Sequence, residues 1–217
     1  MIFGLPKKRP FGLSKREMTF LLFAHLVIAL LMLSPFLPGP GTGSSRVNAL
    51  FSFLQLLSLP LLLLVPVGVL WYMRASSSRA RLYSLLLWTL PVMLLVHCVW
   101  SAPCARERSR ARAIARSEPL LHALAAYQAK YHRYPEELQE LIPRFLPQLP
   151  SPWVLGIAGY VYEPHEGDFQ VSFSQNVLLG FNYEVVVYDP HNHQQAAGEL
   201  STLYPAGASN WQYYLYD

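Results

Sequence analysis

The residues that could bind a metal ion gather in two short segments of the carboxyl-terminal half. His191 and His193 alternate in the segment DPHNHQQ, and a His-x-His pair can ligate zinc when further ligands converge on the same point. The sequence identifies no third ligand, so a polar loop without a metal is the simpler interpretation. We therefore predict no metal site and retain His191 and His193 as weak candidates.

Three carboxylates follow one another in the segment EPHEGD, at Glu163, Glu166 and Asp168. Carboxylates in a loop can bind calcium, but this spacing matches no calcium-binding motif. Paired acids could also serve in general acid–base catalysis, which requires two carboxyl groups in opposed environments. The tip of a solvated hairpin explains the same residues without either role.

Motifs that would indicate an enzyme do not occur in the sequence. It contains no phosphate-binding glycine loop, no nucleophilic serine elbow and no recognisable cysteine nucleophile. Cys98 and Cys104 are separated by six positions, which point to different faces of a helix and disfavour a disulfide. We expect no enzymatic activity, no catalytic residue and no cofactor.

The composition indicates a membrane protein. Only 14% of the 217 residues are charged, and the acidic residues are almost absent from residues 18–101. Soluble domains have roughly 25% charged residues. The net charge of +4 comes from basic residues beside apolar runs, where they suit anionic lipid headgroups. Because no basic stripe alternates with stacking aromatics, we predict membrane lipid rather than nucleic acid as a partner.

Three uncharged apolar runs occupy residues 18–37, 49–73 and 82–102. A helix of about 20 residues crosses the roughly 30 Å of bilayer hydrocarbon, so each run predicts one transmembrane helix. The first run could instead be a signal peptide, but it is too long for a signal core and no cleavage site follows it. We therefore predict three retained spans.

The flanking charges predict an orientation. Residues 1–17 form a basic leader with five lysines and arginines, and the segment after the second run adds Arg74, Arg79 and Arg81. The segment between the first two runs has only Arg46 and reads as a short solvated turn. The positive-inside rule then places the leader in the cytoplasm and residues 105–217 outside it. Five arginines within residues 106–116 oppose this assignment.

Three polar residues interrupt the apolar runs, namely His25, Gln55 and His97. Intramembrane histidines could form a proton relay or a metal pair in a transporter. A neutral imidazole that faces a neighbouring helix is the simpler interpretation.

Residues 105–217 predict a small α+β domain in which an amphipathic helix packs on an antiparallel sheet. Ser117 is a candidate N-cap, and Leu120, Leu124 and Tyr127 follow at helical spacing. Pro135 predicts the end of this helix. A short helix over residues 135–142 and a proline-marked loop follow, and the loop is expected to turn Phe145, Leu146, Leu149 and Trp153 into the core. Alternating patterns predict strands at residues 159–164, 168–174, 183–188 and 210–217.

The segment after this helix carries a family resemblance. Its positions are Tyr134, Pro135, Leu138, Leu141, Pro150, Pro152, Trp153 and Gly156. In this order they resemble the periplasmic domain of type IV pilin-like proteins, especially the major pseudopilins of type II secretion, over about residues 117–173. The resemblance implies a pilin-like fold, a bacterial inner membrane and a periplasmic location for the domain.

Departures from the family pattern limit what the resemblance implies. Arg133 replaces a glycine, Ser151 replaces an aspartate, and three spans replace the single span of a pilin. We therefore expect a non-enzymatic inner-membrane protein whose pilin-like domain contacts a protein partner or the envelope. The alternatives are a component of a pilus or type II secretion-like assembly, and an accessory subunit of a transporter or membrane enzyme. The oligomeric state stays open.

Overall fold

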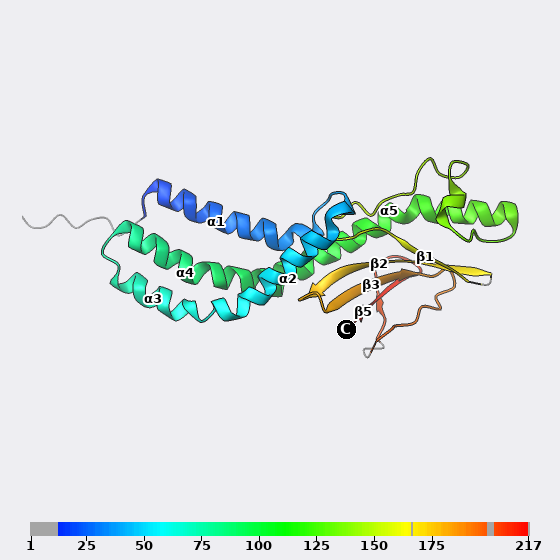
Figure 1. Cartoon of the computed structure of the whole chain (residues 1–217). Coiled ribbons are helices and arrows are strands. Elements are labelled where there is room, and N and C mark those ends of the chain that lie inside the picture. The colour runs from blue at the N-terminus through cyan, green and yellow to red at the C-terminus, as the bar shows by residue number, and fades with distance from the viewer. Residues whose placement is uncertain (1–12, 166, 199–201, 217) are drawn as a thin grey trace, which may run out of the picture.

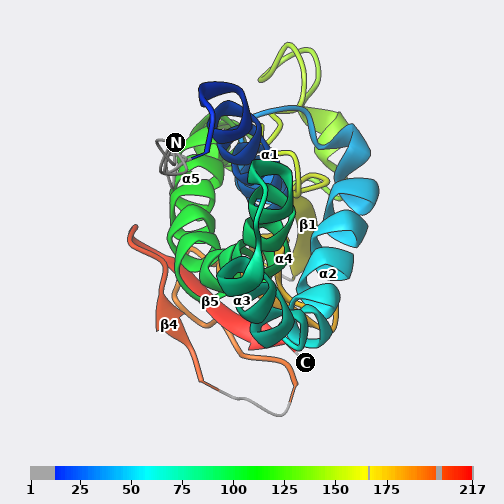
Figure 2. The ribbon, with the colours of Figure 1, turned by 90° about the vertical axis from the view of Figure 1, so that its left-hand side faces the viewer.

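The computed structural model describes residues 13–165, 167–198 and 202–216 and shows an elongated molecule (Figure 1). A helical bundle occupies one end and a β-sheet the other. Most of the predicted basic leader, residues 1–12, lies outside the described residues. The helices are α1 (Lys15–Leu33), α2 (Ser44–Leu61), α3 (Leu64–Arg74), α4 (Ser78–Val96) and α5 (Ala102–Tyr131). In the bundle, α4 packs against α1, α2 and α3 (Figure 2).

The apolar helices agree in part with the predicted spans. Two stretches, Lys15–Phe36 and Ser78–Tyr131, are each long and apolar enough to cross a membrane. The second predicted span is broken, because α2 and α3 meet at an angle of 61° and count as one span only if taken together. Pro66 has no amide hydrogen for the carbonyl of Leu62, which weakens the helix at the break. Pro91 lies inside α4 without interrupting it.

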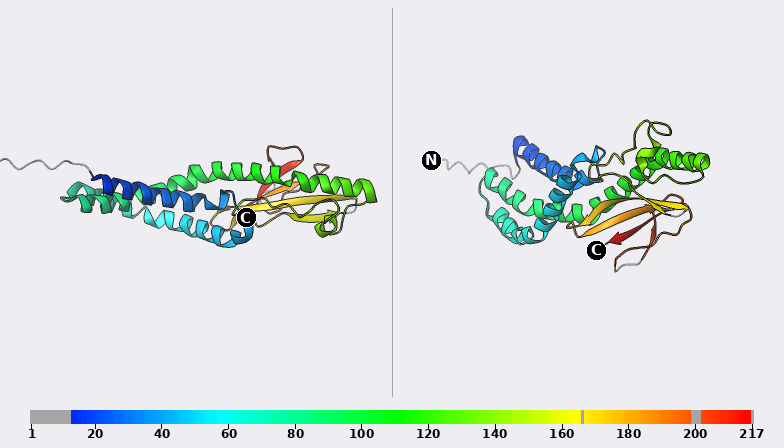
Figure 3. Two further views of the ribbon diagram at one scale, coloured as in Figure 1. Left: turned by 90° about the horizontal axis from the view of Figure 1, so that it is seen from above. Right: turned by 45° about the vertical axis from the view of Figure 1, so that its right-hand side comes forward.

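A single helical path leads from the bundle to the sheet. One turn of π-helix, His97–Ser101, joins α4 to α5, so helical structure continues from Ser78 to Tyr131 (Figure 3). The prediction that Ser117 begins a helix is wrong. Its side chain is buried within α5 and donates a hydrogen bond to the carbonyl of Ile114 at 2.7 Å.

The sheet is antiparallel and has five strands in the order β1-β2-β3-β5-β4. The strands are β1 (Val161–His165), β2 (Asp168–Leu178), β3 (Asn182–Tyr188), β4 (Tyr204–Pro205) and β5 (Trp211–Tyr216). One face packs on α5, where Leu120, Leu124 and Tyr127 are buried together with Val171 and Phe173 of β2. The predicted mixed α+β class, with a helix on an antiparallel sheet, is confirmed. The two residues of β4 were too short to produce a recognisable sequence pattern.

The family-motif segment leads from α5 to the sheet. The short helix is the 3-10 turn η4 (Leu138–Leu141), and Leu141 is fully buried. Pro135 is buried, and its carbonyl accepts a hydrogen bond from the Tyr162 hydroxyl at 2.8 Å. Trp153 was expected in the core, but it is 43% exposed and its ring lies below the guanidinium of Arg116. Its backbone adopts the left-handed conformation, with φ of 54°.

A buried carboxylate joins β3 to the first turns of α5. Glu184 is 1% exposed and forms ion pairs with Arg106 at 3.2 Å and Arg110 at 2.9 Å. It also accepts a hydrogen bond from Gln175, which in turn accepts one from the Ser109 hydroxyl. Two of the five arginines that opposed the predicted orientation are therefore paired with one buried carboxylate, which offsets one of their two positive charges.

The segment after α1 is docked on the sheet domain, so the prediction of a solvated turn is wrong. The amides of Gly156 and Leu155 donate hydrogen bonds to the carbonyls of Pro35 and Leu37, at 2.8 and 3.0 Å. The Asn48 side chain donates to the Gly156 carbonyl at 2.8 Å. Prolines and glycines signalled a turn correctly, but the pattern could not show that their backbone groups pair with residues more than 100 positions away.

Gly156 is a point of close backbone approach in this contact, and it supplies a test. A Cβ atom at this position would lie 2.6 Å from the carbonyl oxygen of Pro35, whereas one at Gly159 would have no atom within 4 Å. We expect Gly156→Ala to cost about 1–3 kcal/mol through overpacking and to lower the thermal unfolding midpoint by several degrees in detergent. Gly159→Ala is the matched control and should unfold like the parent. Equal midpoints for the two variants would contradict the docked arrangement.

Candidate metal centre

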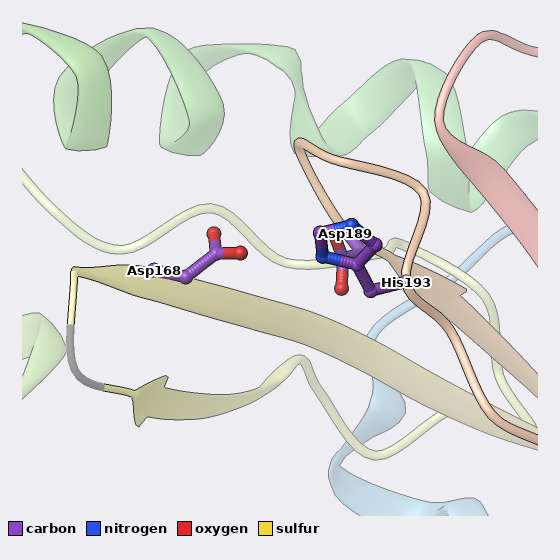
Figure 4. Close-up of side chains that lie close together, drawn as sticks. All are labelled: Asp168, Asp189 and His193. Carbon is purple, nitrogen blue, oxygen red and sulfur yellow. The ribbon is translucent and has the colours of Figure 1, made fainter.

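Three potential metal ligands meet at one edge of the sheet, on the far side of the domain from the helical bundle. Asp168 begins β2, Asp189 directly follows β3, and His193 lies in the loop after it (Figure 4). Because β2 and β3 are antiparallel neighbours, the start of one strand lies beside the end of the other. The sheet topology therefore brings together two carboxylates that are 21 positions apart.

The spacing of the three groups suits a divalent cation. One ligand atom from each of Asp168, Asp189 and His193 lies within 4.8 Å of the other two. Two ligands of a cation with bonds of about 2.1–2.4 Å can be separated by at most about 4.2–4.8 Å. The upper limit on the distances among the three groups therefore matches the widest separation that two ligands of one cation can have.

Asp189 is the fixed member of the cluster. It is 2% exposed, and its carboxylate accepts hydrogen bonds from the His191 amide at 2.8 Å and from the Gln170 side chain at 3.1 Å. Burial raises the pKa of this carboxyl group, but the hydrogen bonds, including one from the His193 amide, outweigh burial and hold the pKa below its usual value. A buried anion is therefore available as a ligand at neutral pH.

The two predicted histidines have different positions. One ring nitrogen of His193 belongs to the ligand group. The Nδ1 atom of His191 instead lies 2.9 Å from a carboxylate oxygen of Asp168. The two rings are stacked with centroids 5.8 Å apart. His191 thus orients Asp168 from outside the ligand group, a role that often accompanies metal ligands.

This ligand set favours particular metals. Carboxylates are preferred by Mg²⁺, Ca²⁺ and Mn²⁺, whereas imidazole suits zinc and other transition metals. Two carboxylates with one imidazole therefore favour Zn²⁺ or Mn²⁺ over Ca²⁺. Three protein ligands also leave coordination positions for water or for a group from another molecule.

The other residues singled out in the sequence lie elsewhere. Glu163 belongs to β1 and is exposed outside the cluster, and Glu166 lies outside the described residues. Each histidine of the apolar helical segments bonds within its own segment, His25 to the carbonyl of Leu21 and His97 to the Ser101 hydroxyl. Asp189 was not singled out from the sequence, where the available signal was an acidic residue directly after the predicted strand 183–188.

Comparison with known proteins finds no family, no curated protein and no solved structure that matches this chain.

Titration of the detergent-solubilised full-length protein with Zn²⁺, Mn²⁺ and Ca²⁺ by calorimetry tests the cluster. We expect one Zn²⁺ or Mn²⁺ site, at least a tenfold loss of affinity in His193→Ala and Asp168→Asn, and about a 10–100-fold loss in His191→Ala. His165→Ala removes an exposed histidine at the end of β1 and should bind like the parent. The assignment is wrong if the parent binds none of these ions or if His193→Ala and His165→Ala behave alike.

Proposed function

We propose that this chain is a non-enzymatic integral protein of a bacterial inner membrane that presents a pilin-like α+β domain in the periplasm. The domain would contact a protein partner or the cell envelope. The continuous helix Ser78–Tyr131 is the observation that carries the proposal, because its first half is apolar and its second half forms the buried core of the sheet domain. One helix thus contributes both to the membrane anchor and to the core of the water-exposed domain.

Three spans fit the proposal best. α1 and α4 are the two long apolar helices, and the bent pair α2 and α3 supplies the third crossing. Leu56 and Leu59 of α2 and Leu63 in the break are exposed large hydrophobic residues, which suits a lipid environment. An odd number of spans places the start of α1 and the sheet domain on opposite sides of the membrane.

The distribution of charge supports a cytoplasmic start for α1. The beginning of α1 and the turn between α3 and α4 lie at the same end of the bundle, away from the sheet (Figure 1). This end carries the basic residues Lys15, Arg16, Arg74, Arg79 and Arg81. At the opposite end Arg106 and Arg110 are paired with Glu184, which reduces the positive charge that opposed this orientation.

The order of elements supports a pilin-like module. A long helix is followed by Tyr134-Pro135, a short helix, a proline-marked loop and an antiparallel sheet. The sheet packs on the second half of the helix. Exposed apolar and aromatic side chains at the outer end, Tyr131 and Ile142, offer a surface for a protein partner.

Divalent-cation binding is a second candidate function. The convergence of Asp168, Asp189 and His193 favours it, and the calorimetric titration described above tests it. Such a site would lie on the outer domain, where a bound ion with free coordination positions could bridge to a partner.

Labelling of single cysteines with a membrane-impermeant maleimide in intact spheroplasts tests the proposed topology. In a Cys98→Ala, Cys104→Ser background, Glu137→Cys lies on the outer domain and Ser76→Cys lies in the turn between α3 and α4, and both positions are exposed. We expect labelling at position 137 in intact cells and labelling at position 76 only after lysis. The reverse pattern would invert the orientation, and labelling of both in intact cells would refute the proposed spans.

A further inference from the structure

The turn between β2 and β3 exposes apolar side chains in a segment without charge. Phe181 is 75% exposed and Leu178 is 48% exposed. Residues 175–183 contain no acidic or basic residue. The turn itself is ordered, with Leu179 and Gly180 at positive φ and the Phe181 amide bonded to the Leu178 carbonyl at 3.0 Å. A water-exposed hairpin tip usually carries polar residues, so this tip requires an explanation.

The same turn is fixed to the apolar helix α2. The Gln55 side chain donates a hydrogen bond to the carbonyl of Val177 at 3.2 Å and accepts one from the Leu179 amide at 2.7 Å. The Asn176 side chain donates to the hydroxyl of Ser52 at 2.9 Å. Gln55 is 4% exposed, and it satisfies two backbone groups that have no strand partner at the end of the hairpin. A polar residue in an apolar helix is thereby explained by its contact with the hairpin.

The position of the turn along the molecule can be obtained from α5. Gln175 of β2 bonds to the carbonyl of Arg106 and to the hydroxyl of Ser109. Leu178 is three residues after Gln175 on β2, which places it about 10 Å closer to the bundle at 3.3 Å per strand residue. On α5, which rises 1.5 Å per residue, a distance of about 10 Å from Arg106 toward the bundle corresponds to about seven residues. The turn is therefore level with Val99 and Trp100, both of which are exposed.

Trp100 marks the place where a bilayer surface would cross the molecule. It follows the third apolar run and precedes the arginines of α5, and tryptophan is enriched at membrane–water interfaces. On α2 the exposed side chains of Phe53 and Leu56 flank the buried Gln55, so the apolar surface of this helix continues onto the hairpin tip. A lipid surface at this level would cover both the apolar surface of α2 and the hairpin tip.

We propose that the β2–β3 turn is a second membrane contact, which inserts Phe181 and Leu178 into the outer interface of the bilayer. The proposal rests on the proposed membrane function and adds a lipid-binding surface to the sheet domain itself. Lipid is favoured over a protein partner because the exposed tip is continuous with the apolar surface of α2 and lies at the level of Trp100.

Collision measurements on spin-labelled protein in phosphatidylethanolamine–phosphatidylglycerol vesicles test this contact. In the Cys98→Ala, Cys104→Ser background, the label is placed at Phe181→Cys, at Leu22→Cys on α1 and at His165→Cys in the opposite hairpin. Leu22 is 64% exposed, and His165 ends β1 at the other end of β2. We expect oxygen to relax the labels at positions 181 and 22 more than a water-soluble nickel chelate does, with the order reversed at position 165.

The three positions separate the possible outcomes. A label at 181 that is as accessible to the chelate as the label at 165, with 22 in lipid, would overturn the contact and leave the membrane anchor intact. A label at 181 shielded from both reagents would show a protein neighbour, such as a second copy, and would also overturn it. Chelate access at position 22 would refute the proposed membrane function itself.

Discussion

The buried carboxylate of Glu184 is the interaction on which the arrangement of this molecule depends. A charge removed from water costs several kcal/mol unless it is paired and hydrogen-bonded, and Glu184 has two arginines and a glutamine around it. All of these partners except Gln175 belong to α5, immediately after the apolar part of the helix. The sheet can therefore occupy only one register along α5, since any shift would leave an unpaired charge inside the protein.

This register connects the sheet to the bundle without a flexible linker. α5 continues α4 through the π-turn, so a sheet fixed on α5 is also fixed relative to the apolar helices. Two further contacts also hold the sheet domain against the apolar helices. The backbone of residues 35–39 pairs with residues 153–156, and Gln55 of α2 holds the end of the β2–β3 hairpin. A module mounted in this way would present its outer surface, including the Asp168–Asp189–His193 cluster, at a defined distance from the membrane.

Local patterns predicted the elements, whereas long-range contacts decided the features that were predicted wrongly. The apolar runs and the alternation of β2 and β3 follow from burial of one face, which sequence periodicity records. Ser117 had the correct residue type for an N-cap, but the preceding residues continue the helix and the hydroxyl bonds within it. Trp153 was expected inside because of its size, yet it is 43% exposed and lies beside Arg116, a contact that a local pattern does not record. For the candidate metal centre, the His-x-His motif indicated His193 as a candidate ligand. The approach of Asp189 to Asp168 could be recognised only from the pairing of β2 with β3.

A distance measurement between the bundle and the outer helix tests most directly whether the sheet domain is fixed relative to the apolar helices. Spin labels at Tyr83→Cys on α4 and Ala111→Cys on α5, in the background without Cys98 and Cys104, lie on either side of the π-turn at exposed positions. A continuous helix separates 28 residues by about 42 Å, so we predict one narrow distribution near this distance in vesicles. A broad distribution, or one centred well below this value, would show a hinge between the bundle and the sheet domain and would contradict the account.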